Sequence, residues 1–174
     1  MPDTETYQFT SSLEISTNKL WGAHFAVPDL VSGILIDGED RRVICTLNEK
    51  VEYQCAMLPR GDGSFLITVN KKIREQLKLQ AGSTLRVSLK KDTSEYGLPM
   101  PEEMAEVLAQ DDEGNKLFHA LTPGKIRTLL YIAGNVKSSE KRISRSIAIV
   151  EHLKETKGKI DFKMLNIKLK ESQV

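Results

Sequence analysis

The sequence predicts a mainly β protein with added helices. Six short strands are expected to close into a small pseudo-twofold β-barrel capped by short helices, followed by a small C-terminal helical domain. Three observations support this prediction. Alternating apolar and polar residues, typical of half-buried strands, recur through the first 91 residues. Two strand–helix–strand segments occur within them. After residue 100, apolar residues recur at helical spacing instead.

The predicted strands are short and several end at proline or glycine. Proline removes a ladder donor, and glycine turns the chain at little steric cost. Pro28 ends the second strand, Pro59 ends the fourth, and Gly61-Asp62-Gly63 forms the turn before the fifth. The predicted strands cover residues 6–15, 20–27, 42–47, 51–58, 65–69 and 84–90.

Residues 25–47 and 65–89 share one pattern: strand, short helix, glycine turn, strand. In the second segment Asn70 can cap the helix, and Ile73 and Leu77 fall on one helix face. Chance similarity of two such units is the alternative to a true repeat. A true repeat favours the pseudo-twofold barrel, because closure removes exposed sheet edges.

The C-terminal half changes in character after Lys91. Pro101 and Thr122-Pro123 are typical helix starts, and Ser138 or Ser139 can cap the last clear helix. That helix is expected to bury Ile143, Ile147, Val150 and Leu153. The Lys-rich tail is expected to be an extra strand or hairpin half, or disordered. The predicted parts are a barrel domain (1–92), a linker (93–100), a four-helix domain (101–155) and the tail (156–174).

Composition limits the choice of partners and compartments. A net charge of +1 argues against a strongly electrostatic partner for the whole chain, and no apolar run is long enough to span a bilayer. The polar N-terminus does not resemble a secretory signal, so we expect a cytoplasmic protein.

Cys45 and Cys55 lie in neighbouring strands. A disulfide requires a register that places them opposite each other, and buried reduced thiols are the favoured alternative.

No catalytic constellation is visible. The three histidines, His24, His119 and His152, lie far apart and have no metal-ligand spacing to Cys or carboxylates. We therefore predict no catalytic residue, no metal and no cofactor, and hence a protein that is not an enzyme. Trp21 and His24 can form the wall of a pocket, with a core position for Trp21 as the alternative.

Positive charge is unevenly distributed in the second half and in one short helix. Such clusters can neutralise phosphates and give weak, salt-sensitive binding to nucleic acid. A solvated helix face is the favoured alternative. The candidate partner or phosphate-binding surface comprises Lys71, Lys72, Arg74, Lys137, Lys141, Arg142 and Arg145.

The segment LITVNKKIREQLKLQAGSTLRVSL (residues 66–89) resembles the strand–helix–strand hairpin of AbrB/MazE-like double-split barrels. The longer span 9–91 resembles the domain of unknown function 1905, through Val27-Pro28, Pro59, Gly61-Asp62-Gly63 and Gly82. The resemblance implies a double-split β-barrel capped by helices. AbrB-like proteins build this barrel from two chains, whereas six strands suffice for one.

Residues 101–153 are similar to the YdeI/OmpD-associated, or bacteriocin-protection, family. The matching features are the Pro-Glu helix start, the Leu121-Thr122-Pro123 corner and Lys141-Arg142-Ile143. The chain departs from the usual pattern by having Tyr131-Ile132 in place of Trp-Ile, and Asn135-Val136-Lys137 in place of Ala-Lys.

The resemblance implies a non-enzymatic binding or stress-protection protein, with a role in resistance to bacteriocins or other envelope stress. The alternative is a nucleic-acid-binding regulator that uses the basic helix faces. A third class, less favoured, is a small-ligand binder or enzyme with a cleft between barrel and helices near Trp21 and His24. The expected partner is an unidentified protein or ligand, and the chain is expected to be a monomer or weak homodimer.

Overall fold

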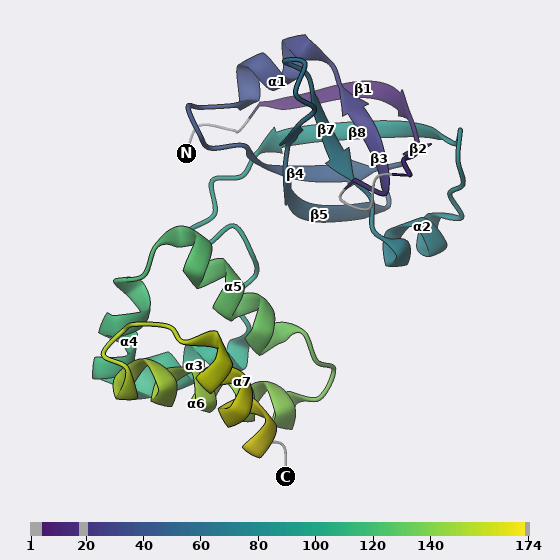
Figure 1. Cartoon of the computed structure of the whole chain (residues 1–174). Coiled ribbons are helices and arrows are strands. Elements are labelled where there is room, and N and C mark those ends of the chain that lie inside the picture. Colours follow the sequence, from purple (N-terminus) through teal and green to yellow (C-terminus); the bar gives the residue numbers. More distant parts are fainter. Residues whose placement is uncertain (1–4, 18–20, 173–174) are drawn as a thin grey trace. The chain divides into compact units, whose positions relative to one another are not determined.

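The computed structural model describes residues 5–17 and 21–172 (Figure 1). The chain divides into two compact units, Met1–Thr93 and Ser94–Val174. The first contains the strands and two short helices, and the second contains the remaining helices. None of the described helices combines the length and the apolar character that crossing a membrane requires.

The described strands of the first unit form two antiparallel sheets of four strands each. One sheet has the order β1-β8-β4-β5 and the other β2-β3-β7-β6. Apolar side chains from both sheets share one core, in which Phe25, Leu47 and Leu89 are fully buried. The strands are β1 (Thr6–Ser12), β2 (Glu14–Ile15), β3 (Ala23–Val27), β4 (Arg42–Leu47), β5 (Val51–Ala56), β6 (Leu58–Pro59), β7 (Phe65–Thr68) and β8 (Thr84–Lys91).

The predicted six-stranded closed barrel is not confirmed, because the described strands form two sheets and neither sheet closes. Two of the predicted strands are each divided at one buried residue, Leu13 between β1 and β2 and Met57 between β5 and β6. The Leu13 N–H donates to the Ser83 carbonyl (2.9 Å), and the Met57 N–H donates to the Arg41 carbonyl (2.9 Å). At these residues the chain leaves one sheet and enters the other. Alternation predicts which side chains face the core, but not where a strand changes partner.

Both short helices of the first unit form where the sequence predicts them: α1 spans Asp29–Leu35 and α2 spans Lys71–Leu77. The Asn70 side chain accepts a hydrogen bond from the Ile73 N–H (2.9 Å), which confirms the predicted cap. Ile73 is buried and Leu77 packs against the same core. The predicted second strand begins at residue 20, which lies outside the described residues.

The helices of the second unit pack around α6, which contacts α3, α4, α5 and α7 (Figure 1). Their core includes Met104, Phe118, Leu129 and Ile149. The Ser138 side chain accepts from the Lys141 N–H, so Ser138 is the cap of α6. The helices are α3 (Glu102–Gln110), α4 (Asp112–His119), α5 (Pro123–Gly134), α6 (Ser139–Glu155) and α7 (Phe162–Glu171).

The buried face of α6 differs from the predicted stripe. Val150 and Leu153 are buried, whereas Ile143 and Ile147 are 42% and 41% exposed. Because α6 is surrounded by four other helices, its buried face is broad and extends to Ala148. The centre of the buried face therefore does not pass through Ile143 and Ile147. The spacing of apolar residues alone does not show which side of a helix its neighbours cover.

The described part of the tail contains a helix, so the prediction of an extra strand or disorder is wrong there. Helix α7 begins after Asp161, whose side chain accepts from the Met164 N–H (3.1 Å). Leu165 and Leu169, four residues apart, are buried against the core. In the sequence Ile160, Phe162 and Met164 alternate with polar residues, as do Leu165, Ile167 and Leu169, and these two alternations hide the helical spacing. The Lys168 ammonium fixes α7 to α6 through Glu155 (2.6 Å) and Glu151 (3.5 Å).

His152 on α6 holds the start of α7. Its imidazole is buried, and Nε2 accepts a hydrogen bond from the Asp161 N–H (3.1 Å). Burial lowers the pKa of His152, against the smaller opposing effects of Glu155 and Asp161 and with a further lowering by Lys168. The folded protein therefore favours the neutral imidazole, which is the form that can accept this bond.

Gly114 lies in α4 where that helix packs tightly against Val150 of α6. A Cβ placed on it would lie 2.3 Å from Val150 Cγ1. We expect Gly114→Ala to destabilise the second unit by about 1–3 kcal/mol through overpacking. Chemical denaturation measures this, with Gly124→Ala as the control because open space surrounds that position. Equal stability of the two variants would contradict the close packing.

His152 gives the second unit a pH-dependent stability. Its pKa is lower in the folded than in the unfolded state, so the unfolded state binds the proton more readily. The stabilisation is complete above the usual histidine pKa of about 6.5 and declines as pH falls below it. We expect His152→Gln, which keeps an acceptor but does not titrate, to weaken this decline between about pH 6.5 and 5. Denaturation across this range measures it, and identical profiles would refute the role of His152.

Candidate functional site

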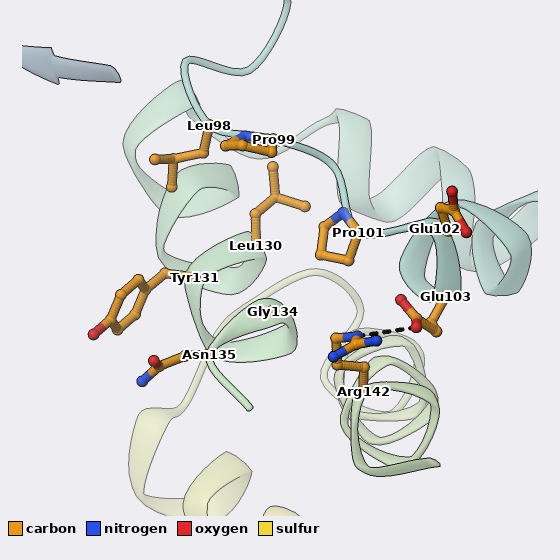
Figure 2. Close-up of a pocket in the computed structure, with 10 residues that line it drawn as sticks. All are labelled: Leu98, Pro99, Pro101, Glu102, Glu103, Leu130, Tyr131, Gly134, Asn135 and Arg142. Carbon is orange, nitrogen blue, oxygen red and sulfur yellow. Dashed lines mark hydrogen bonds and ion pairs between the residues drawn. The ribbon is translucent and has the colours of Figure 1, made fainter. Parts of the chain in front are cut away.

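A surface pocket of about 520 Å³ lies in the second unit, which we call the α3–α5 pocket (Figure 2). It opens between the segment that precedes α3, the first turn of α3, the end of α5 and the start of α6. All of its lining therefore comes from one compact unit. The residues that line it are Leu98, Pro99, Pro101, Glu102, Glu103, Leu130, Tyr131, Gly134, Asn135 and Arg142.

The apolar wall of the pocket depends on a close approach between Pro101 and α5. A Cβ on Gly134 would lie 3.1 Å from Pro101 Cγ, so the absence of a side chain lets the two segments come together. Leu130 is buried beneath them, whereas Tyr131 is 61% exposed. In Figure 2, Tyr131 and Asn135 project from the end of α5, across the pocket from the glutamates of α3.

Arg142 joins three of the segments around the pocket. Its Nε donates to the Glu103 carboxylate (2.9 Å), as Figure 2 shows. Its Nη1 donates to the carbonyls of Val136 (2.9 Å) and Lys137 (2.7 Å), in the turn between α5 and α6. Ser139 also donates to Glu103 (2.9 Å). The guanidinium thus fixes α3 and this turn to α6.

Glu103 is held in its charged form. Its own backbone N–H, then the Ser139 hydroxyl and Arg142 lower the pKa of its carboxyl group, and partial desolvation opposes them. At neutral pH Glu103 and Arg142 therefore form an ion pair, and their opposite charges cancel. Glu102, next to it and exposed, supplies the remaining negative charge of the lining.

The lining combines apolar surface with a few polar groups, as small-molecule and peptide pockets commonly do. The Tyr131 hydroxyl, the Asn135 amide and the Glu102 carboxylate are available for hydrogen bonds at its edge. The lining residues include no Ser, Thr, Cys, His or Lys. Within the described part of the chain, no three His, Cys, Asp or Glu side chains come together as a metal ion would require.

The structure places the seven predicted basic residues in different settings. Arg142 lines the pocket, and the neighbouring Arg145 donates to the Ile132 carbonyl of α5 (2.9 Å). Both guanidinium groups are thus used within the fold. Lys137 and Lys141 are exposed beside them. Lys71, Lys72 and Arg74 belong to α2 in the other unit. Phosphate binding by these residues stays a prediction.

Trp21 and His24 lie together in the first unit and do not line the α3–α5 pocket. Their rings meet edge to face, with centroids 5.9 Å apart. His24 is buried, and its Nδ1 donates to the Gly22 carbonyl (3.0 Å). Its Nε2 accepts from Arg60 (3.1 Å), which also pairs with Glu14 (3.0 Å). The His24 imidazole therefore has a structural role, because its Nε2 accepts a hydrogen bond in the cluster that it forms with Arg60 and Glu14.

Cys45 and Cys55 are free thiols, because the register of β4 and β5 does not place them opposite each other. Cys45 faces Tyr53, and Cys55 faces Val43. Burial raises the pKa of the Cys45 thiol to about 12 and also raises that of Cys55. Both thiols are therefore protonated, and hence weak nucleophiles, at neutral pH.

Of the ten lining residues, only Arg142 was among the predicted site residues. The others lie in two separate stretches, residues 98–103 and 130–135, and only the folded chain brings them together. The available signal was the pair of prolines at the end of the predicted linker, Pro99 within it and Pro101 just after it, because two prolines stiffen a segment that would otherwise be flexible. That segment forms one wall of the pocket.

Comparison with known families gives two matches. Residues 9–89 match the domain of unknown function DUF1905. Residues 98–156 match the bacteriocin-protection, YdeI or OmpD-associated family. The two matches confirm the predicted families and their order along the chain. A search of curated proteins found no significant match.

Arg142 should be important for the integrity of the pocket. Replacing it with alanine leaves the Val136 and Lys137 carbonyls without their donor. We therefore expect Arg142→Ala to cost about 1–3 kcal/mol in the free energy of unfolding. Lys141→Ala is the matched control, since Lys141 precedes Arg142 on α6 and is exposed. Chemical denaturation of both variants is the measurement. If Arg142→Ala lowers the free energy of unfolding no more than Lys141→Ala does, Arg142 does not stabilise the pocket in this way.

Proposed function

We propose that this chain is a non-enzymatic binding protein that protects against bacteriocins or a related stress, and that the α3–α5 pocket is its ligand site. One observation carries the proposal: all ten lining residues, from Leu98 to Arg142, fall within the residues that match the bacteriocin-protection family. The family match suggests the protective role, and the pocket is the part of that segment suited to a ligand.

The chemistry of the lining supports binding rather than bond breaking. General acid–base or nucleophilic catalysis needs a nucleophile or a titrating group near the reacting atoms. Of the two carboxylates in this lining, Glu103 is already paired with Arg142, and Glu102 is exposed at the edge of the pocket. Leucine and proline surface, by contrast, favours the burial of an apolar ligand.

The polar groups define the complementary features of the ligand. Glu102 and Asn135 lie on opposite sides of the pocket and can accept hydrogen bonds, and the Tyr131 ring offers an amphipathic face. We therefore expect a ligand with an apolar body and hydrogen-bond donors at its edge. Because Arg142 is occupied by Glu103 and two carbonyls, a phosphate group would have to displace existing bonds.

Two substitutions at the mouth of the pocket test the proposal. Tyr131→Ala removes contact surface, and Asn135→Trp fills the entrance. We expect each to reduce protection, measured as survival of bacteria that produce the protein during bacteriocin challenge. A lost contact of about 1.4 kcal/mol corresponds to a roughly tenfold shift in the protective range.

Thr128→Ala is the matched control, because Thr128 is exposed on the same helix and does not line the pocket. Circular dichroism and protein abundance establish that each variant is folded and present. If folded Tyr131→Ala and Asn135→Trp proteins protect as well as the wild type, the pocket is not the site of the protective activity.

A further inference from the structure

A second hollow, of about 460 Å³, lies between α3 and α6, and we call it the α3–α6 groove. Its apolar surface comes from Val107, Ile143 and Ile147. The two isoleucines, four residues apart on α6, are 42% and 41% exposed. Glu102 and Glu106 form an acidic rim along α3. The groove is therefore apolar at its centre and negative at its edge.

Helix α7 has the opposite character on its outer face. Leu165 and Leu169 face the core, whereas Met164 and Ile167 are each 51% exposed. Lys163 and Lys170 lie beside them on the exposed side, because positions 163, 164, 167 and 170 share one helix face. Neither lysine forms an ion pair with another residue in the described part of the chain, in contrast to Lys168.

The two surfaces are both apolar at the centre and carry opposite charges at the edge. The groove offers an isoleucine pair with glutamates at its rim, and α7 offers Met164 and Ile167 with flanking lysines. We propose that α7 of one copy of this chain docks into the α3–α6 groove of a second copy, and that the exchange is reciprocal. The occupant is a second copy because the complementary surface is present in the same sequence.

The arrangement of the helices makes this contact intermolecular. In each chain α7 is fixed to α6 by Lys168 and by the buried Leu165 and Leu169, so its outer face points away from its own α6. The groove and α7 both adjoin α6. A twofold axis beside α6 lets both copies make the same contact, so each groove–helix pairing occurs twice.

The groove shares Glu102 and Glu103 with the α3–α5 pocket, but the proposal does not rest on the protective activity, and it is tested by association alone. The groove variant carries Glu106→Lys and Gln110→Lys, two rim positions outside that pocket. The helix variant carries Lys163→Glu and Lys170→Glu. Sedimentation velocity at low ionic strength gives the mass of each over a concentration series.

We expect the wild type to shift from 19.5 kDa towards twice that mass as concentration rises. Each variant alone should stay monomeric, because like charges then face each other at both contacts. An equimolar mixture of the two variants should recover the dimer, since every groove then meets an α7 of opposite charge. Lys116→Glu with Lys125→Glu is a charge-matched control that should dimerise like the wild type.

Two outcomes would overturn the proposal. The first is a wild-type protein that stays monomeric at millimolar concentration, including one that binds anionic vesicles through Lys163 and Lys170 instead. The second is a mixture of folded variants that fails to restore the dimer, which would mean that the charges act non-specifically. Circular dichroism of each variant separates loss of association from loss of folding.

Discussion

The pocket depends on the bonds by which the Arg142 guanidinium joins α3 and the turn between α5 and α6 to its own helix, α6. Where α5 ends, its last carbonyls and those of the following turn need donors, since a helix cannot satisfy them internally. Arg142 and Arg145 donate to Val136, Lys137 and Ile132, and Arg142 also holds Glu103 at the start of α3. The same bonds that complete the end of one helix thus set the distance between the walls of the pocket.

This arrangement explains why positive charge alone was a poor guide to the site. The sequence correctly indicates a basic cluster at the start of α6, but it does not show which carbonyls the guanidinium groups face. In the folded unit, two of the four charges are used to join helices. The wall of the pocket comes instead from Leu98, Pro99 and Pro101, a segment whose role depends on contacts with distant residues.

In the first unit, periodicity predicted the positions of strands and helices, and the Asn70 cap, but the closed barrel that it favoured is not confirmed, because the described strands form two open sheets. Leu13 and Met57 are apolar and buried, as a continuous strand would also require, so the change of partner leaves no local signal. In the second unit, α7 was misread because its alternating residues also satisfy a spacing of four, seen in Leu165 and Leu169. Whether such a segment becomes a strand or a helix is decided by the element on which it packs, which is α6 in this case.

The two thiols provide a means of observing one half of the chain alone. The chain's two cysteines and its single tryptophan all fall in the first unit, and both thiols are protonated and largely shielded while β4 and β5 remain paired. Alkylating reagents will therefore modify them mainly after that sheet opens. Labelling kinetics and indole fluorescence will report the opening of the first unit, and helical circular dichroism will largely follow the second.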